Sequence, residues 1–540
     1  MKKLYILLLM AFSAVSCTAD KPLTGYVNPL LGTATLWEPE DLGYVRTWKE
    51  RTWGAEVFPG SSLPNAMVQL SPVTQFRSGA GYQYEDTVIY GFAHTNKGHW
   101  NLLHLPLLPA TGKVSASDYA SGYSHQKESA RPGYYRVYLE RYGIDAELTS
   151  TLRCGYHRYS FPDNQPKQVI ADMTRTNNHV REWAIQQTGE KVFTGFQDAE
   201  GKMYFYAVSN YPIEDIRQLK DDRHEVSLVD FEKSNKDGEN KPLELKIGLS
   251  FVSIENAKMN LEAEMLHKSF NQVREEANTE WNKLLSKIKV SGGTEREKGI
   301  FYSTLYRSFL WPALRSDVNG DFTDERGEVV NEGFRYYTNP SFWDDYRNKL
   351  VLLAMLSPDI TTDIIQSITD KGEKRGGYMP TFFHGDHASV FVAGSYLRGI
   401  TGFDLERAYK LLLKNATVPG RGGRPYLDEY IERGWIAEKD TTNVPTWDEY
   451  KAAVTKTVEY AYDDYATALI AKELGDQENY RLLMERSGNY KNLFDPSTGF
   501  WRGKIDNGEW IADFDPYYPY FAYMYREANA WQSLFFAPHD

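Results

Sequence analysis

The residues best suited to bind or cleave a ligand lie in two short stretches. These are Trp343-Asp344-Asp345-Tyr346-Arg347 and, further along the chain, Gly385-Asp386-His387. Carboxylates accept hydrogen bonds from sugar hydroxyls, an arginine orients a carboxylate, and an indole offers an apolar ring face. These are the parts of a sugar-cleaving pocket. On a helix, Asp344 and Arg347 share a face, so from these residues alone an ordinary salt bridge is the simpler explanation.

Histidines near these carboxylates have to be weighed as metal ligands. His384, Asp386 and His387 form only a weak metal-binding pattern, and no HExxH motif or cysteine-rich cluster supports zinc. Asp386 would serve equally well as the cap of a helix that begins near Ala388. His94 follows a strand-like stretch, where a loop could point into a pocket, but a turn bonded to its own backbone is the simpler explanation.

The composition limits the classes of partner. The 540 residues include 61 basic and 73 acidic side chains, which give a formal net charge of -12, and no dense block of lysine and arginine occurs. This balance does not favour nucleic acid as a partner. Aromatic residues make up 14% of the chain, which is compatible with stacking platforms for sugars, but composition alone favours an aromatic-packed core.

The N-terminus is typical of a targeting segment. Two lysines precede the apolar run Leu4–Val15, which is too short to span a membrane and ends close to Cys17. Residues 1–17 therefore read as a bacterial lipoprotein signal, with Cys17 lipidated and the protein anchored in the cell envelope. Which side of the membrane it faces stays open. Cys154 then has no partner, so stability has to come from the core and not from disulfides.

The first half of the chain shows the two-residue period of strands. From about residue 26 to 254 apolar and polar residues alternate between turn-forming residues. Tyr135–Leu139 and Ile144–Leu148 predict a hairpin, and Leu243–Phe251 is the clearest single strand, with one face buried and one wet. This pattern predicts an antiparallel β-sandwich over residues 18–255.

The second half has the period of helices. Residues 256–290 are expected to form a helical linker of one or two helices, and residues 291–540 a helical toroid. No repeat typical of a solenoid is visible. The fold class that we predict is therefore multidomain: a β-sandwich followed by a toroid of helices.

One predicted helix carries a pair of acids. Apolar residues from Val454 to Leu469 mark an amphipathic helix that Gly475 can terminate. Within it, Glu459 and Asp463 form a like-charge pair at helical spacing, which costs stability unless a cation or ligand lies between them. Solvated neighbours on a surface are the simpler explanation.

Taken in order along the chain, these motifs resemble glycoside hydrolase family 92, the exo-acting α-mannosidases of Bacteroidetes. The resemblance covers nearly the whole mature chain and is collinear. The matching stretches are Val27–Thr33, Phe58–Gly60, Met67–Pro72, Gly81–Tyr82, Gly91–Thr95, Ile254–Ala257, Trp343–Arg347, Gly385–Ala388, Val458–Asp464, Phe494–Pro496 and Glu527–Gln532.

The resemblance implies a β-sandwich packed on an (α/α)6 barrel, with the site at their interface. It implies calcium-dependent, inverting hydrolysis of α-mannosides of the N-glycan or mannan type, in which one carboxylic acid protonates the glycosidic oxygen and a second carboxylate activates water. Glu527 matches the general acid and Asp344 the sugar-binding aspartate, and Trp343, Arg347 and His94 are expected to contact the sugar.

Several positions depart from the family's pattern. Asn96 interrupts the family's His-Thr-His-Leu-Ser-Gly loop, Ala528 replaces a glycine and Gly394 an aspartate. The Gly-Asn-Glu-Pro-Ser-His-His and Gly-Asn-Asp-Asp segments, which supply calcium ligands and the catalytic base, do not occur in this sequence. We therefore expect an incomplete toroid from a truncated or split product, with the base and the metal ligands beyond Asp540.

Two other classes of function remain open. A catalytically inactive, surface-anchored glycan-binding protein, or a non-functional paralogue, would still bind sugar, and Glu527→Gln would leave its affinity nearly unchanged. Another helical-toroid enzyme would be an inverting hydrolase for a different sugar, or a lyase that uses tyrosine and histidine and releases an ultraviolet-absorbing product. The oligomeric state is not indicated by the sequence.

Overall fold

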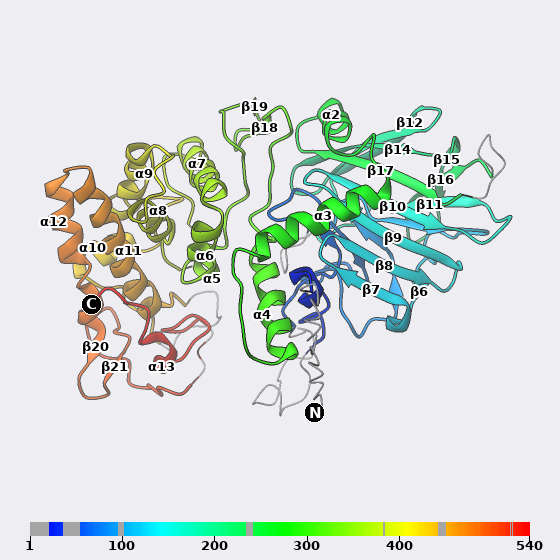
Figure 1. Cartoon of the computed structure of the whole chain (residues 1–540). Coiled ribbons are helices and arrows are strands. Elements are labelled where there is room, and N and C mark those ends of the chain that lie inside the picture. The colour runs from blue at the N-terminus through cyan, green and yellow to red at the C-terminus, as the bar shows by residue number, and fades with distance from the viewer. Residues whose placement is uncertain are drawn as a thin grey trace, which may run out of the picture.

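The computed structural model describes residues 21–35, 54–95, 102–233, 241–381, 384–440, 450–518, 520 and 522–540. The predicted signal at residues 1–17 and its Cys17 lie outside these ranges, so lipid anchoring stays a prediction. Within the ranges, no helix combines the length and the apolar character that crossing a bilayer requires. Figure 1 shows a sheet-rich half beside a helical half, with α3 and α4 between them.

Two large antiparallel sheets form the first half. One sheet has, in spatial order, the strands β1 (Ser61–Ser62), β2 (Gln69–Val73), β4 (Gly91–Ala93), β5 (Leu107–Ala110), β11 (Lys167–Ala171), β16 (Glu225–Phe231) and β15 (Ile213–Lys220). The other has β12 (Glu182–Gly189), β13 (Val192–Asp198), β14 (Lys202–Ser209), β17 (Leu243–Ser250), β10 (Cys154–Ser160), β9 (Ile144–Ser150), β8 (Tyr134–Leu139) and β7 (Glu128–Arg131). Short pairs join β3 (Val88–Ile89) to β6 (Ser121–Gly122), β18 (Phe322–Thr323) to β19 (Val329–Val330), and β20 (Phe494–Asp495) to β21 (Phe500–Trp501).

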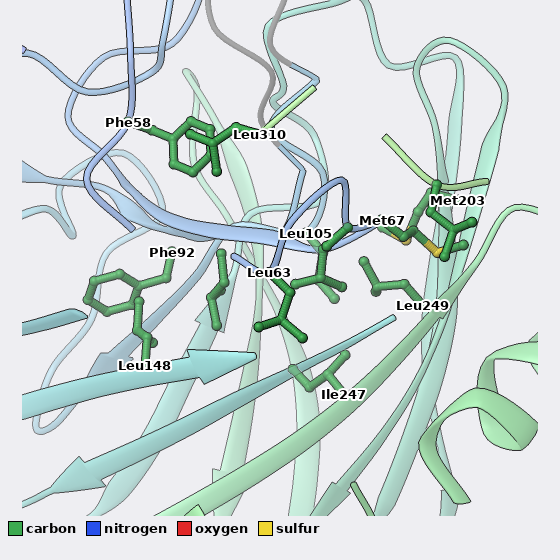
Figure 2. Packing of buried hydrophobic residues seen from close by; sticks show 14 of the residues in the cluster. Phe58, Leu63, Met67, Phe92, Leu105, Leu148, Met203, Ile247, Leu249 and Leu310 are labelled. Atoms are coloured by element: carbon green, nitrogen blue, oxygen red, sulfur yellow. The ribbon is translucent and has the colours of Figure 1, made fainter. Parts of the chain in front are cut away.

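Apolar side chains from both sheets fill the space between them. Figure 2 shows Phe92 of β4 close to Leu148 of β9, with Ile247 of β17 further along the core, and all three are fully buried. The predicted hairpin is confirmed, because β8 and β9 pair with Tyr135 opposite Leu148. Burial of this inner layer is the main stabilising contribution to the sandwich.

The strand β17 differs from its prediction at its C-terminal end. It alternates between buried and half-buried residues only over its first half, and its last four residues are all buried. The reason is that helix α2 (Ile254–Glu264) covers the outer face there. Gly248 permits this close approach, since a Cβ atom at that position would lie 2.1 Å from the carbonyl oxygen of Ala257.

The linker consists of two helices, α2 and α3 (Phe270–Leu285), and α4 (Glu295–Ser308) follows them. A capping box starts α3 at Ser269 and another starts α4 at Thr294. The fully buried Trp281 of α3 donates its indole N–H to the carbonyl of Ser62 at 2.7 Å, which ties the linker to the sandwich. The exact domain boundaries drawn from the sequence stay predictions.

The second half is helical, so the predicted order of a sheet-rich domain before a helical one is confirmed. Its helices are α5 (Phe342–Asp345), α6 (Lys349–Leu356), α7 (Pro358–Lys374), α8 (Ala388–Leu397), α9 (Leu405–Thr417), α10 (Leu427–Arg433), α11 (Ala453–Glu473), α12 (Gln477–Arg486) and α13 (Ala530–Ser533). Short 3-10 helices occur at Leu23–Tyr26, His125–Lys127 and Asn489–Leu493. Helix α11 packs against α8, α9 and α12.

Helix α11 begins and ends close to its predicted limits, and Gly475 follows it with a left-handed φ of 78°. The expectation that it is amphipathic is wrong, because most of its residues are buried on all sides. Glu459 and Asp463 are fully buried rather than solvated. Polar groups from other elements surround these two acids, and sequence periodicity within one helix cannot reveal such partners.

Candidate functional site

The short helix α5 presents the Trp343–Arg347 stretch in a mixed environment. Asp344 is exposed, whereas Asp345 and Tyr346 are buried. Because α5 ends at Asp345, Arg347 lies in the turn before α6 and no longer shares a helix face with Asp344. The simple Asp344–Arg347 salt bridge is therefore wrong: among the described ion pairs, Arg347 binds Glu459 of α11 instead.

Arg347 is held from several sides. One guanidinium nitrogen lies 2.7 Å from the buried Glu459 carboxylate, and another donates to the carbonyl of Trp343 at 2.9 Å. Its guanidinium carbon lies 4.4 Å from the ring centroid of Tyr346 and 4.6 Å from that of Phe536. Stacking and a charge-assisted hydrogen bond together fix this side chain and the backbone of Trp343.

The cation between the two acids of α11 is a histidine. His387 directs Nδ1 to Asp463 at 3.0 Å, and its Nε2 lies 3.4 Å from Glu459. Burial by itself lowers the pKa of His387, but the two carboxylates outweigh it and raise the pKa overall. The ring of Tyr346 stacks on His387 at 3.9 Å, and its hydroxyl donates to Glu459 at 2.9 Å. The stretch after α5 thus rests on a buried ion network.

Asp386 belongs to the same network and does not cap α8. The N-cap position is occupied by His387, and no side-chain cap bond is made there. The carboxylate of Asp386 instead accepts hydrogen bonds from Asn415 at 2.9 Å and from Arg424 at 3.2 Å. Arg424 also binds Asp464 of α11 at 2.6 Å. The cap interpretation is therefore wrong, because a charge from a distant loop competes for this carboxylate.

Glu527 lies in the C-terminal segment, which is fastened on both sides of it. The backbone N–H of Arg526 donates to Thr455 of α11 at 3.0 Å, and Ala528 forms an antiparallel bridge with Tyr520. Glu527 itself has a left-handed φ of 47°, which is unusual for a non-glycine residue and occurs often at functional sites. Its side chain is 44% exposed, so its carboxyl group is accessible to a ligand.

The charge of Glu527 acts on Asp344, although the two residues are far apart in the sequence. Partial burial of the Asp344 carboxyl group, together with the negative charges of Asp345 and Glu527, raises its pKa to about 6. Two carboxyl groups on the surface, from α5 and from the C-terminal segment, thus share one environment. Such a pair is suited to holding a polar ligand and to donating a proton to it.

Trp343 precedes Asp344 in the chain and contacts His384. Trp343 is half-buried, and its ring meets that of His384 edge to face at 6.3 Å. Behind His384 lies the buried Lys456 of α11, whose ammonium group is 2.8 Å from His384 Nδ1. The described site therefore combines an aromatic face, two accessible carboxyl groups and an imidazole.

Comparison with known proteins decides the family. Residues 26–262 match the glycosyl hydrolase family 92 N-terminal domain, and residues 256–540 match the glycosyl hydrolase family 92 catalytic domain. The chain belongs to glycosyl hydrolase family 92. By its catalytic domain it is a glycosidase.

Solved structures of family 92 share this fold. A family GH92 alpha-mannosidase from Bacteroides thetaiotaomicron is 27% identical, with a TM-score of 0.84 over 96% of this chain and 72% of that one. A family GH92 inverting mannosidase from the same species is 23% identical, with a TM-score of 0.83 over 96% of this chain and 71% of that one, which shows the fold alone. An uncharacterized secreted glycosidase from Arthroderma benhamiae is 25% identical over 98% of this chain and 72% of its own length.

His94 occupies a different environment from the other predicted site residues of this family 92 chain. It is fully buried, its Nδ1 lies 2.9 Å from the carbonyl oxygen of Leu105, and its Nε2 lies 2.9 Å from Nε2 of His157. Burial lowers the pKa of His94 to about 4. The structure thus places it inside the sandwich, and its role in sugar binding stays a prediction.

Calcium is the cofactor that the family 92 resemblance implies. Within the described ranges, no group of three or more His, Cys, Asp or Glu side chains is arranged to hold a metal ion. The calcium requirement stays a prediction.

Some residues around the family 92 site escaped the sequence analysis. Arg424 and Lys456 are single cations in unremarkable contexts, so nothing in the sequence singled them out. One signal was present: Glu459, Asp463 and Asp464 are embedded among apolar residues in a helix. Acids in such a setting need cationic partners, which distant arginines and histidines can supply.

Proposed function

We propose that this family 92 glycosidase is an exo-acting α-mannosidase that inverts the anomeric configuration and acts on mannose-containing glycans. The observation that carries the proposal is the electrostatic interaction of Glu527 with Asp344, the residue next to Trp343, together with the fold shared with an alpha-mannosidase. We also propose secretion with a lipid anchor at Cys17. The secreted relative from Arthroderma benhamiae supports the secretion, and labelling of the wild type and Cys17→Ala with a fatty-acid analogue tests the anchor.

Each side chain has a distinct part in this proposal. Glu527 protonates the glycosidic oxygen as the bond to the leaving group breaks. Asp344 accepts hydrogen bonds from hydroxyls of the terminal mannose, and the ring of Trp343 covers an apolar face of the sugar. Arg347 does not touch the substrate in this proposal; through its bond to the Trp343 carbonyl it fixes the turn after α5. An inverting enzyme also needs a base that activates water, and we assign none.

The stereochemistry of the product tests the proposed function. The chain is incubated with an α-linked mannobiose in the presence of calcium, and the first product is followed by proton NMR before mutarotation. β-Mannose is expected as the initial product. Initial α-mannose would overturn the inverting mechanism. Binding of the disaccharide without any hydrolysis would favour the glycan-binding alternative.

The proposed role of Asp344 makes sugar binding dependent on pH. With its pKa at about 6, the carboxyl group is largely ionised at pH 8, whereas at pH 5 only about one tenth of it is ionised. Protonation removes charge and acceptor capacity, so mannose affinity is expected to fall by up to about tenfold from pH 8 to pH 5. Calorimetric titration measures the mannose affinity at each pH. Asp344→Asn should bind weakly with a flat profile, and identical profiles for both proteins would contradict the role.

A further inference from the structure

The N-terminus of helix α11 is capped from outside the helix. The first N–H groups of any helix have no partner within it, and the residue before α11, Ala452, has a left-handed φ of 50° and makes no side-chain cap bond. The N–H of Ala453 donates to the carboxylate of Glu438 at 3.0 Å, and the N–H of Val454 donates to the carbonyl oxygen of Met524 at 3.0 Å. A distant glutamate and the C-terminal segment thus supply the acceptors that the helix start needs.

Glu438 is the centre of this arrangement. Its side chain belongs to a residue that is only 1% exposed, and its carboxylate accepts hydrogen bonds from four backbone N–H groups. These belong to Lys439 at 3.0 Å, Lys451 at 3.0 Å, Ala453 at 3.0 Å and Met524 at 3.2 Å. Among the described ion pairs, none includes this carboxylate. N–H dipoles at the positive end of α11 therefore hold its charge, and the positive charge of Lys456 lies close enough to act on it.

The same contacts hold the segment that carries Glu527. Met524 donates its N–H to Glu438, and its carbonyl oxygen accepts the N–H of Thr455 at 3.3 Å. Two residues further on, the N–H of Arg526 donates to Oγ1 of the fully buried Thr455 at 3.0 Å. Met524 and Glu527 both have left-handed backbones, with φ values of 56° and 47°. Non-glycine residues keep this conformation only where the surroundings impose it, so these contacts fix the backbone that presents Glu527.

We propose that Glu438 and Thr455 are positioning residues that fix the segment of Glu527 on the N-terminus of α11 and thereby determine where the proposed general acid stands. The inference rests on the proposed function of Glu527, and neither positioning residue touches the substrate. A general acid has to lie within hydrogen-bond reach of the leaving oxygen, and a displacement of about 1 Å can cost roughly a hundredfold in rate. Loosening these contacts should therefore impair proton transfer to the leaving group more than it impairs sugar binding.

Two substitutions loosen the segment from different sides. Glu438→Gln replaces one acceptor oxygen with an amide group that faces N–H donors, so hydrogen bonds to the backbone are lost. Thr455→Val keeps the shape of a buried side chain and removes the acceptor of the Arg526 N–H, so it tests the proposal even if Glu438→Gln does not fold. Asp404→Asn is the matched control. Asp404 also accepts an N–H at a helix start, that of Arg407 at 3.0 Å, but it caps α9 and has no described hydrogen bond or ion pair with the C-terminal segment.

The leaving group of the substrate separates a positioning role from a general structural defect. On an α-linked mannobiose, Glu438→Gln is expected to lower the rate by about 10- to 100-fold and Thr455→Val by about fivefold. On an activated aryl mannoside both rates should fall by less than about twofold, because this leaving group needs little protonation. In the Glu527→Gln background no acid is left to position, so Glu438→Gln should add less than about twofold there. Asp404→Asn should match the wild type on both substrates. An equal loss on both substrates, or a loss fully additive to that of Glu527→Gln, would overturn the positioning role.

Hydrogen exchange of the full chain tests the backbone contacts independently of activity. Mass spectrometry follows peptides that cover residues 522–528 in the wild type and the variants. Their amides should exchange about tenfold faster in Glu438→Gln, less strongly so in Thr455→Val, and at the wild-type rate in Asp404→Asn. Unchanged exchange in both Glu438→Gln and Thr455→Val refutes the proposal. If the wild type hydrolyses neither substrate, the proposed function fails and the catalytic part of the inference fails with it, whereas the exchange result still decides whether Glu438 holds the segment.

Discussion

Glu527→Gln is expected to lower the rate of α-mannoside hydrolysis by about 10²- to 10⁴-fold, because a glutamine amide cannot supply the proton that the leaving oxygen needs. The substitution preserves the shape of the side chain, and the left-handed backbone at this position is not changed. Mannose affinity should therefore change little. Initial rates with an activated aryl mannoside and with a disaccharide measure the effect, and the activated substrate should suffer less because its leaving group needs less protonation.

A second glutamate in the same segment provides the control. Glu509 is exposed and precedes Trp510 in the C-terminal part of the chain, so Glu509→Gln removes an equal charge without touching the proposed site. Its rate should match that of the wild type. Equal rates for Glu527→Gln and the wild type would remove Glu527 from the acid role, whatever the family assignment.

Local patterns predicted the elements well because they depend on neighbours in the sequence. The hairpin of β8 and β9 and the extent of α11 follow from periods of two and 3.6 residues. The same reasoning failed for contacts between side chains. The spacing of Asp344 and Arg347 predicted an ion pair, but α5 is only four residues long, and Glu459 from a distant helix binds the arginine.

The site itself was predictable only through resemblance. Nothing local joins Asp344 to Glu527, since their proximity depends on how the C-terminal segment is tied to α11 through Thr455. The left-handed backbone of Glu527 is equally invisible to a pattern, because glutamate has no preference for it. Tertiary contacts over long sequence separations decide both features.

Removing one cation from the buried ion network beneath the site should destabilise the helical half strongly. Arg424 is buried between Asp386 and Asp464, and Asp464 also pairs with Arg486 at 2.8 Å. Arg424→Met fills a similar volume but leaves two buried carboxylates short of a cation. Breaking a buried pair in this way costs about 3–5 kcal/mol. Native-state hydrogen exchange of the α11 amides measures the local loss without assuming two-state unfolding of the whole chain.

A substitution in an exposed ion pair is the control, because it removes a charge without leaving a buried carboxylate unpaired. Arg407 binds Glu373 at 2.6 Å with both side chains more than a third exposed, so Arg407→Met should change stability by less than about 1 kcal/mol.

The pH dependence of the stability of Arg424→Met provides a further check. In Arg424→Met the lowering effect of Arg424 on the pKa of Asp386 is lost, so the pKa of this buried carboxyl group rises, it takes up a proton as pH falls, and the cost of its charge disappears. The deficit relative to the wild type should therefore be largest near pH 8 and smaller at pH 5. A deficit that is the same at both values would point to a packing defect rather than to unpaired charge.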